Sequence, residues 1–472
     1  MSRPLLRAED CARIHEASLD VLETVGVRVD DADAVALLER HGAAETTRPD
    51  TVRLPRSLVR ECLSSCPPTA RVTDRRGRLR EFGPGGPALF WTGNALYVAR
   101  GQKRDDLRAG DLAELTRVAE ACPEIDGVVG TSIADFPPPA RDVVGFREMA
   151  RNTAKHLRPC IFTPQGAGVI VEMGKVLAGG ASLRERPVVS FGYSIVSPLH
   201  WTSTGVGVMR NTSGHGLPLM INSEPMGGGT APVTLAGCLV LANADTLSGI
   251  VIAQLLERGR PIIYNVGFAH VLDMATGVAL TGAPENALLQ SAGADLARFH
   301  SLPSASWMST ESMLPDAQAA AETMMTGLAH AAWGVNVVWG AGNLESTLCM
   351  SAEKLVIDDE LIGSIRRFVR GIPVSDDTLA LEVIRELGHR ADFLSHEHTL
   401  AHFQQELRRS SLMVRSKRDA WARNGSRDMS ERAGERVREI LGRPHEPQLS
   451  LEQERELTRI VDGHLAAIGA PG

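Results

Sequence analysis

Aromatic side chains are scarce in this sequence, and several stand where a ligand site would need them. Only 4% of the residues are Phe, Trp or Tyr. Four of these, Trp91, Tyr193, Tyr264 and Trp307, lie near the carboxyl ends of short apolar runs that predict β-strands. Any one ring could simply fill the core, but rings that converge attract a cation by about 1–2 kcal/mol for each desolvated ring. As a set they favour a site for a quaternary ammonium group, which cannot form hydrogen bonds.

Neutral polar and acidic side chains follow most of the same apolar runs. As further substrate contacts we predict Asn94, Gln165, Ser197, Asn222 and Glu224. In the loops after the last two runs we predict a catalytic role for Glu311, Asn343 and Glu345. Such residues more often cap loops and turns, so we expect only about a third of the whole set to touch a ligand.

A run of three glycines, Gly227, Gly228 and Gly229, precedes a long predicted helix at residues 233–258. Main-chain N–H groups in this run could bind an anion such as a carboxylate. Glycine could equally leave room for a large ligand, or for a cofactor carried by a partner protein, to approach the backbone. The spacing matches neither the P-loop nor the dinucleotide-binding pattern, which argues against a nucleotide site.

Two groups of histidines could in principle bind a metal ion. His270 lies near Asp273, while His398 and His402 are spaced by one helical turn, a spacing that zinc sites use. The second pair falls in the C-terminal region, away from the predicted strand ends, so we predict a capping and packing role for it. The cysteines are isolated from one another along the chain and form no thiolate cluster. We therefore predict no catalytic metal.

Eight short apolar runs recur along the middle of the chain, and helical patterns separate them. The runs cover residues 89–92, 127–132, 159–163, 188–193, 217–222, 261–266, 304–308 and 336–340. Their spacing of about 25 to 45 residues and their continuous apolar character are typical of parallel strands buried on both faces. The sequence therefore predicts an α/β fold, a (β/α)8 TIM barrel, whose strand ends bring the candidate residues to one mouth.

Helical segments flank the predicted barrel on both sides. We predict three parts: an N-terminal helical cap with a surface hairpin at residues 1–87, the barrel at 88–372, and a helical extension at 373–472. Amphipathic patterns predict helices at residues 10–25 and 31–41 within the cap. The extension is rich in charge, and its patterns predict five further helices.

Composition excludes several classes of function. The net charge is −7 and the basic residues are dispersed, so no basic stripe is available for nucleic acid or an anionic membrane surface. No apolar run reaches the roughly 18 residues that a membrane span needs. The seven cysteines form an odd and scattered set, which favours a reducing cytoplasm.

Three segments resemble one known family in their order and spacing. They are MLPDAQAAAE at 313–322, GAGNLESTLCMSAEKLVIDDE at 340–360 and FLSHEHTLAHFQQEL at 393–407. The chain resembles the trimethylamine methyltransferase family, the corrinoid-dependent amine and betaine methyltransferases, over nearly its whole length. Members of that family that use trimethylamine carry a pyrrolysine in the barrel, whereas all 472 residues here are standard amino acids. The resemblance therefore points to the branch without pyrrolysine, which demethylates quaternary amines such as glycine betaine.

The resemblance implies methyl transfer from a quaternary amine to the Co(I) of a corrinoid. The corrinoid would be carried by a separate small protein, so this chain would bind no cofactor tightly and would act on cob(I)alamin held by its partner. The amine leaves as a neutral product, so the protein needs to position the substrate and exclude water more than to supply an acid. We expect the partner to dock over the barrel mouth against the glycine run, and we expect a homo-oligomer.

Other classes of function remain open on the sequence alone. One alternative is a different barrel enzyme that uses acid–base chemistry, for which Glu311 or His200 could serve. Schiff-base chemistry is disfavoured, because none of the five lysines falls at a predicted strand end. A second alternative is a barrel that binds a betaine without turning it over. The methyl donor itself could be glycine betaine, carnitine, proline betaine, choline or a methylated aromatic.

Overall fold

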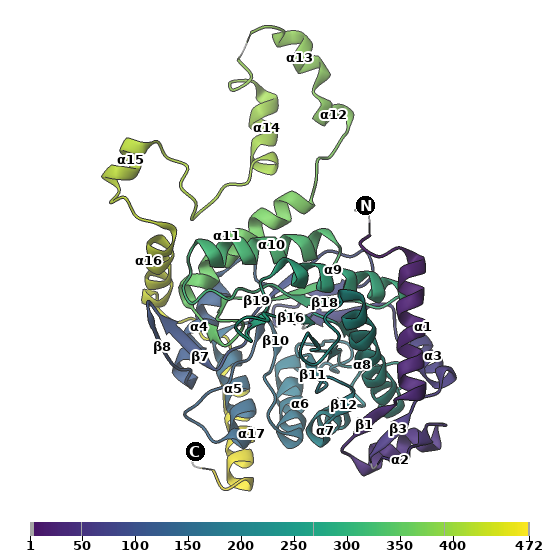
Figure 1. Cartoon of the computed structure of the whole chain (residues 1–472). Helices are drawn as coiled ribbons and strands as arrows, with labels where there is room; N and C mark the ends of the chain where they lie inside the picture. The colour runs from purple at the N-terminus through teal and green to yellow at the C-terminus, as the bar shows by residue number, and fades with distance from the viewer. Residues whose placement is uncertain (1–3, 49, 268, 391, 471–472) are drawn as a thin grey trace.

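Eight parallel strands form the centre of the protein. The computed structural model describes residues 4–48, 50–267, 269–390 and 392–470. Figure 1 shows these strands inside a layer of helices. The strands are β6 (Leu89–Thr92), β9 (Gly127–Val129), β10 (His156–Arg158), β11 (Phe191–Ser194), β13 (Leu219–Asn222), β15 (Ile262–Asn265), β18 (Ala305–Trp307) and β19 (Val337–Ala341).

The eight strands close into a ring. One sheet has the order β10-β9-β6-β19-β18 and a second has the order β11-β13-β15. Parallel bridges join the two sheets at both ends, between Leu157 and Val189 and between Tyr264 and Ser304. Because the ring leaves no open edge, both faces of every strand are covered, as their apolar character requires. The predicted barrel is confirmed.

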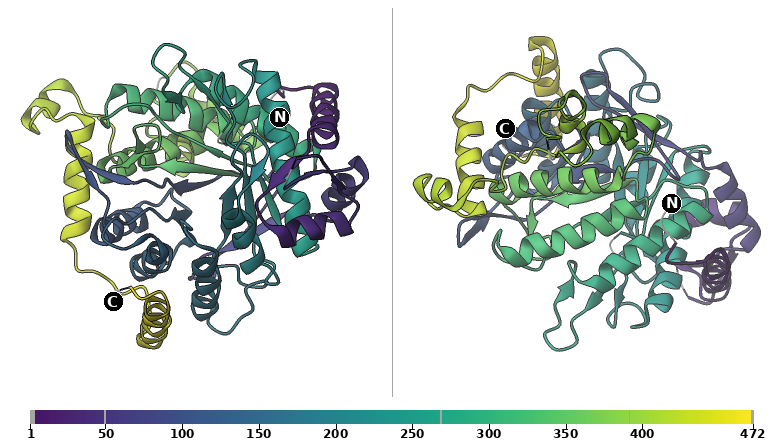
Figure 2. Two further views of the ribbon diagram at one scale, coloured as in Figure 1. Left: turned by 60° about the horizontal axis from the view of Figure 1, so that its bottom comes forward. Right: turned by 90° about the horizontal axis from the view of Figure 1, so that it is seen from above.

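A helix follows each strand and packs on the outside of the ring (Figure 2). These helices are α4 (Ala109–Ala121), α5 (Pro138–Asn152), α6 (Pro164–Ala178), α7 (Ser203–Asn211), α8 (Leu235–Leu256), α9 (Pro284–Phe299), α10 (Ala317–Ala332) and α11 (Ala352–Val369). Asp316 caps α10 as expected, by accepting a hydrogen bond from the main-chain nitrogen of Ala319 at 3.0 Å. The helix α7 was not predicted, because its glycines weaken the helical pattern.

The third strand lies earlier in the chain than the sequence suggested. The prediction placed it at residues 159–163, but β10 is His156–Arg158 and the predicted residues form the loop after it. Two of its three side chains are polar, His156 and Arg158, and all three are buried. A search for apolar runs therefore passed over this strand and selected the loop.

Loops at the carboxyl ends of the strands form two small sheets beside the barrel mouth. The first contains β20 (Asn343–Leu344), β21 (Cys349–Met350), β7 (Tyr97–Arg100) and β8 (Lys103–Asp106). The second contains β14 (Met226–Gly227), β16 (His270–Leu272) and β17 (Ala279–Leu280). Each small sheet joins loops from different parts of the chain, which limits how far these loops can move.

The N-terminal segment attaches to one side of the barrel. Its elements are α1 (Ala8–Thr24), β1 (Val27–Val29), α2 (Ala32–Arg40), β2 (Ala44–Glu45), β3 (Thr51–Arg53) and α3 (Arg56–Ser65). The strand β1 pairs in parallel with β12 (His200–Trp201), which belongs to the loop after β11. The predicted hairpin is present as β4 (Ala70–Thr73) paired with β5 (Leu79–Phe82).

The helix α8 is long and apolar enough, by length and composition alone, to cross a membrane. Its window has a mean hydropathy of 1.7, so the expectation that no such run exists is wrong for this helix. In the fold, 72% of that window is buried. The inner side of α8 packs on strands β13 and β15 of the barrel wall, and its outer side is covered by α1 and α3. The apolar character of α8 is therefore that of a core helix.

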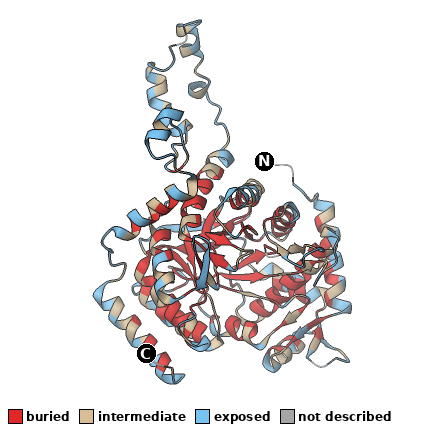
Figure 3. Cartoon of the chain, turned by 60° about the vertical axis from the view of Figure 1, so that its left-hand side comes forward, coloured by how far each residue is buried: buried red, intermediate tan, exposed pale blue. Residues whose placement is uncertain are grey.

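The C-terminal region divides into packed helices and an arm. The helices α16 (Met429–Gly442) and α17 (Leu451–Ala467) pack on the outside of the barrel, against α11 and α4 and against α5 and α6 respectively. Between α11 and α16 the chain leaves the barrel as an arm (Figures 1 and 3). The arm carries α12 (Asp376–Leu379), α13 (Leu381–Leu387), α14 (Glu397–Glu406) and α15 (Arg418–Arg423). The predicted division at residues 87 and 372 stays a prediction.

Candidate functional site

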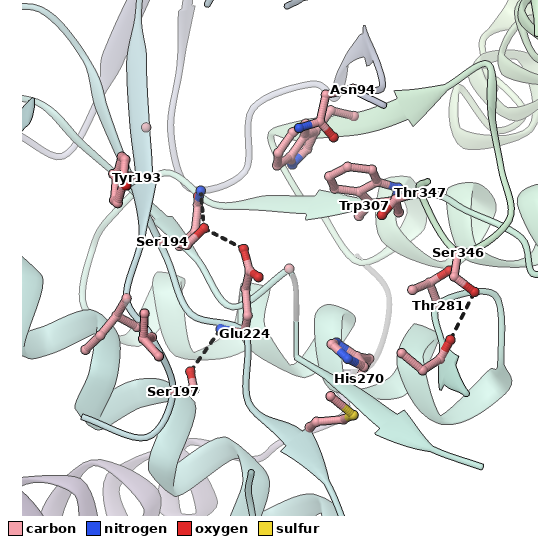
Figure 4. A pocket seen from close by; sticks show the side chains of 18 of the residues that line it. Asn94, Tyr193, Ser194, Ser197, Glu224, His270, Thr281, Trp307, Ser346 and Thr347 are labelled. Carbon is pink, nitrogen blue, oxygen red and sulfur yellow. Dashed lines mark hydrogen bonds between the residues drawn. The ribbon is translucent and has the colours of Figure 1, made fainter. Parts of the chain in front are cut away.

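A cavity of about 680 Å3 opens among the loops at the carboxyl ends of the barrel strands (Figure 4). Its walls come from the loops or ends of seven of the eight strands, all except β9, from Asn94 after β6 to Thr347 after β19, with α9 contributing Asn286 and Gln290. Barrel enzymes bind their substrates in this position, because it is where loops from many strands meet. We therefore take this cavity as the candidate functional site.

Six of the predicted substrate contacts line the cavity. They are Asn94, Tyr193, Ser197, Asn222, Glu224 and Trp307. Figure 4 shows Tyr193, Ser194 and Glu224 on one side of the cavity and Trp307 and Thr347 on the other. The structure thus brings together residues that are up to about two hundred positions apart in the chain. Their contact with a substrate stays a prediction.

Aromatic rings form part of the wall. Trp307 and Trp339 stand opposite each other in the paired strands β18 and β19, and their ring centroids are 4.1 Å apart. Tyr193 contributes a third ring from β11. The cluster offers the aromatic faces that attract a cation that forms no hydrogen bonds.

Glu224 projects into the cavity on a network of hydrogen bonds (Figure 4). The hydroxyl of Ser194 donates to the Glu224 carboxylate, and the Asn222 side-chain nitrogen donates to that hydroxyl at 3.3 Å. Burial raises the pKa of Glu224, while the Ser194 hydrogen bond and the charge of Arg158 act to lower it. The ionised carboxylate would place a negative charge within reach of a cationic ligand.

Buried polar groups behind the wall hold this network in position. The side-chain nitrogen of Asn265 donates to the Asn222 carbonyl oxygen at 2.8 Å. On α8, the buried Asp245 accepts hydrogen bonds from the hydroxyls of Ser197 at 2.6 Å and Ser223 at 3.0 Å. Burial raises the pKa of Asp245 to about 6, against the lowering effect of these hydrogen bonds. Asp245 thereby ties the loop after β11 to the end of β13.

Arg158 is a buried cation in the cavity wall that the sequence reasoning missed. Arg158 is only 5% exposed, and its guanidinium carbon lies 4.5 Å from the centre of the Trp339 ring. Among the described residues, its Nε has no hydrogen-bond partner. Burial lowers its pKa to about 10, so the group remains positively charged at neutral pH. A cation in such a position attracts an anionic group of a ligand.

Room for Arg158 depends on a glycine in the neighbouring strand. A Cβ atom at Gly192 would lie 2.5 Å from one terminal nitrogen of Arg158, which is closer than real contacts allow. Arg158 was missed because β10 was placed three residues too late in the sequence. A signal was nevertheless present, since a basic residue directly before a buried apolar run is unusual in a barrel strand.

Two further titratable side chains, Cys160 and His270, line the cavity. Burial raises the pKa of the Cys160 thiol to about 11, with the charge of Arg158 acting in the opposite direction. At neutral pH the thiol is therefore protonated and is a poor nucleophile. His270 lies on β16, on the small sheet that covers one edge of the cavity. Neither residue was predicted to contact a substrate.

Three predicted substrate contacts lie outside the cavity. Trp91 is buried within the barrel and its ring packs beside His156 at a centroid distance of 5.3 Å. Tyr264 faces the outer helices, where its hydroxyl donates to the Asn243 side chain on α8 at 2.8 Å. Gln165 is exposed in the first turn of α6. These three residues are removed from the candidate site, since two of them fill the core and the third faces solvent.

The three predicted catalytic residues hold loops together and do not line the cavity. The Glu311 carboxylate accepts hydrogen bonds from the Thr281 hydroxyl at 2.8 Å and the Gly282 nitrogen at 2.7 Å. Asn343 is buried, and its side-chain nitrogen donates to the main-chain carbonyl of Asn94 at 2.7 Å. Glu345 forms an ion pair with Arg104 at 2.5 Å. These contacts hold loops together and do not support the predicted catalytic role, which stays a prediction.

The loop that carries Glu345 nevertheless reaches the cavity through its next two residues, Ser346 and Thr347. Three successive residues, Glu345 to Thr347, have φ values of 53°, 49° and 78°. Residues other than glycine rarely adopt this left-handed conformation, and such strain is concentrated at ligand sites and tight turns. The strained turn is what points the carboxylate of Glu345 away and presents Ser346 and Thr347.

The predicted glycine run borders the cavity without lining it. Gly227 ends β14, and Gly228 has a φ of 92°. The flanking residues Met226 and Thr230 line the cavity instead. Gly229 is exposed beside them at the rim. A partner that approaches the mouth would meet this loop, as the sequence suggested, but no anion site is formed by its N–H groups alone.

Metal-ligating groups gather elsewhere in the molecule. In the part of the chain that the structure describes, a cluster of this kind is formed by Asp377, His398 and His402. It lies in the arm, on α12 and α14, and neither helix contributes a residue to the cavity wall.

Comparisons with known proteins agree with this geometry. The family described as "Trimethylamine methyltransferase (MTTB)" matches residues 2–469. The chain is 31% identical over 471 residues to trimethylamine methyltransferase MttB2 of Methanosarcina mazei, covering 97% of this chain and 94% of that protein. It is 30% identical over 465 residues to the glycine betaine methyltransferase of Desulfitobacterium hafniense, covering 97% and 96%.

Solved structures support the fold. The monomethylamine methyltransferase MtmB of Methanosarcina barkeri superposes with a TM-score of 0.51 at 11% identity, covering 91% of this chain and 98% of that one. A hydroxylamine complex of MtmB gives a TM-score of 0.54 at 11% identity, covering 91% and 87%. At this identity the likeness concerns the fold alone. The match of the family over nearly the whole sequence carries the assignment: the chain is a methyltransferase and belongs to the trimethylamine methyltransferase family.

Proposed function

We propose that this methyltransferase takes a methyl group from a betaine, a quaternary amine that also carries a carboxylate. The acceptor is the Co(I) of a corrinoid held by a partner protein. Family membership supports the reaction class, and the name of one relative, glycine betaine methyltransferase, supports the kind of substrate. The observation that carries the choice of a betaine is Arg158, a buried cation in the cavity wall.

The charges of the cavity suit a zwitterion. The Arg158 guanidinium would pair with the carboxylate of a betaine, while Trp307, Tyr193 and the Glu224 carboxylate would surround its ammonium group. A buried charge without a partner costs several kcal/mol, and a ligand that supplies the partner recovers part of that cost. Trimethylamine and choline have no carboxylate and would leave Arg158 with the charge of Glu224 alone to balance it. Glycine betaine, proline betaine and carnitine would not.

The chemistry needs little from the protein beyond position. A corrinoid carried to the cavity would supply Co(I) as the nucleophile, and the methyl group would end on cobalt as methyl-Co(III). The C–N bond would break with its electron pair staying on nitrogen, so the tertiary amine would leave without a proton. The substrate is already cationic, so no residue has to activate it. The side chains need to hold the ammonium group, align the C–N bond and exclude water. The protonated thiol of Cys160 and the aromatic wall are compatible with this role.

The rim of the cavity offers a surface for the partner. Six βα loops each present an exposed apolar side chain, with exposures from 45% to 70%. These rim residues are Leu96, Val196, Val233, Met274, Met313 and Leu348. Exposed apolar side chains that surround one opening mark an interaction surface more often than scattered ones do. We propose that the corrinoid protein docks on these rim residues and brings its cobalt to the cavity.

We also propose that the protein is cytoplasmic and forms a homo-oligomer. All seven cysteines are free, which suits a reducing compartment. The arm exposes apolar side chains, among them Leu379, Ile384 and Leu400, that association of two chains would cover.

An anaerobic methyl-transfer assay tests the reaction. The purified protein is mixed with free cob(I)alamin and one of glycine betaine, proline betaine, carnitine, choline, tetramethylammonium or trimethylamine, and the absorbance change from Co(I) to methyl-Co(III) is followed. Methylation with a betaine, and little with the donors that lack a carboxylate, is the expected result.

Two other results would contradict the proposed function. Methylation with trimethylamine or choline but not with any betaine would overturn the substrate class. No methylation by any donor, even with the cognate corrinoid protein present, would contradict the reaction. Tight betaine binding in that case would indicate the non-catalytic alternative, and its absence would favour acid–base chemistry in the barrel.

A further inference from the structure

The arm between α11 and α16 has no hydrophobic core of its own. None of the described residues from 366 to 411 is buried, and Figure 3 shows this part of the arm in the exposed and intermediate classes. Leu412, further along the arm, is buried, but it packs on the core of the barrel. A segment that buries no apolar side chains of its own rarely holds a fold without a disulfide, a metal ion or association with another chain. No disulfide is available, since all seven cysteines are free and none lies in the arm. Another device is needed to keep α12 and α14 together.

Three metal-ligating side chains meet between these two helices. One ring nitrogen from each of His398 and His402 and one carboxylate oxygen of Asp377 all lie within 4.8 Å of one another. His402 Nε2 is 3.2 Å from a carboxylate oxygen of Asp377. His398 Nε2 lies 3.2 Å from the main-chain carbonyl oxygen of Asp377. The two imidazole rings lie side by side on α14, with their centroids 4.3 Å apart and their planes tilted by 40°.

We propose that Asp377, His398 and His402 bind a zinc ion that clamps α12 to α14. Zinc bonds of about 2.1 Å in tetrahedral geometry place neighbouring donor atoms about 3.4 Å apart, so small side-chain rotations suffice to close the cluster. Two imidazoles and a carboxylate are borderline ligands that suit zinc. The fourth position is left for water or for a group from another molecule. The clamp is structural and independent of the methyl-transfer reaction.

The clamp explains features of the sequence that a packing role leaves without a reason. His398 and His402 were expected to cap and pack, yet both remain partly exposed and neither helix buries a residue. His396 does cap α14, because its Nδ1 accepts a hydrogen bond from the His398 nitrogen at 3.1 Å. The two remaining histidines of the segment do not cap the helix, and both contact Asp377.

Zinc binding to the full-length protein tests the proposal. The wild type, the double variant H398A/H402A and the conservative variant D377N are stripped with EDTA, incubated with ZnCl2, dialysed and analysed for zinc. The matched control is H389A, which removes an exposed arm histidine outside the cluster. We expect the wild type and H389A to retain about one more zinc ion per chain than the double variant, with D377N binding more weakly than either. Equal zinc content in wild type and double variant would overturn the site.

Limited proteolysis tests whether the metal acts as a clamp. Arg385 and Arg390 are exposed trypsin sites on the arm. Since cleavage follows the population of the opened arm, zinc should slow it by about tenfold in the wild type and in H389A but not in H398A/H402A. Circular dichroism of each variant shows whether the barrel is intact. A cleavage rate that does not change with zinc would overturn the clamp. A rate that falls only as protein concentration rises would also overturn it, and would indicate that a second chain orders the arm.

Discussion

At the scale of single residues, the wall of the cavity carries one positive and one negative side chain. Arg158 and Glu224 both line it, and each is linked to a different surrounding: Arg158 to the Trp339 ring and Glu224 to the Ser194 hydroxyl. A ligand with one charge satisfies one of these groups, whereas a zwitterion satisfies both. Under the proposed function, we therefore expect the positions of these two residues to influence which methyl donors bind.

Replacing Arg158 should change the substrate preference more than the chemistry. In R158M the carboxylate of a betaine loses its partner, and loss of one buried charge pair costs about 2–4 kcal/mol, or roughly 30- to 1000-fold in binding. KM for glycine betaine should rise by that factor, while the weak reaction of tetramethylammonium, which has no carboxylate, should be unchanged or faster. R158K should recover part of the affinity as a point charge.

A control outside the cavity makes this result specific. Arg104 carries the same group but pairs with Glu345 away from the wall, so R104Q should leave both donors unaffected. An equal loss for both donors in R158M would contradict a role in recognising the carboxylate and would indicate damage to the barrel.

The pH dependence of binding should report the ionisation of Glu224. Burial raises its pKa, so the carboxylate that attracts the ammonium group is lost at a higher pH than for an exposed glutamate. KM for glycine betaine should therefore increase as pH falls from neutral, over a range that begins above the ordinary pKa of a glutamate, by about tenfold if one charge contact worth about 1.4 kcal/mol is lost. Arg158 and the quaternary ammonium keep their charges over this range.

Two variants identify the group that titrates. E224Q should have a higher KM and a weaker pH dependence, and any dependence that remains is expected from the buried Asp245, whose pKa is raised to about 6. H270N removes the other titratable ring that lines the cavity, and it should keep the wild-type pH dependence. A flat profile in H270N together with an unchanged profile in E224Q would assign the effect to His270.

At the scale of elements, the period of the barrel was readable because its strands are apolar on both faces. Seven of the eight predicted strands overlap the observed ones, whereas the third was displaced into a loop by the polar side chains of β10. That single displacement concealed Arg158. The direction of a strand's side chains was not readable either, because alternation disappears when both faces are buried. Tyr264 was therefore placed in the site although it faces α8.

Tyr264 should behave as a core residue when it is changed. Y264F removes the hydroxyl that donates to Asn243 and leaves the ring in place. Losing one buried hydrogen bond should lower the free energy of unfolding by about 1–2 kcal/mol, measured by denaturant titration. KM and kcat for the betaine should remain those of the wild type. An increase in KM without a loss of stability would return Tyr264 to the substrate site.

Loops limited what the sequence could say about the site. The residue types chosen at the strand ends were reasonable, yet whether each points inward depends on turn geometry. In the loop after β19, the left-handed turn places Ser346 and Thr347 in the cavity wall, and it directs the Glu345 carboxylate to an ion pair with Arg104. Only φ and ψ values decide such an outcome, and residues other than glycine give little warning of a positive φ.

At the scale of the whole molecule, the two ends of the chain surround the barrel and leave its mouth open. The N-terminal segment and α17 pack on the outer helices, while the exposed rim residues encircle the cavity. The proposed reaction uses a corrinoid, which is far larger than the amine, so the proposed carrier protein would have to approach this opening. A charge placed on the rim should therefore disturb the partner without disturbing the cavity.

The double variant M274E/M313E tests docking on the rim. Met274 and Met313 are 70% and 64% exposed, on loops after β15 and β18, so glutamate is tolerated in the free protein but buries a charge in the complex. With the cognate corrinoid protein as acceptor, kcat/KM should fall by about ten- to a hundredfold. With free cob(I)alamin the rate should stay at the wild-type level, because the cavity is unchanged. L451E, at an equally exposed leucine on α17, should leave both rates unaltered. An equal fall in kcat/KM with both acceptors would instead show that these methionines maintain the structure of the cavity. An unchanged kcat/KM with both acceptors would show that the partner does not dock on these rim residues.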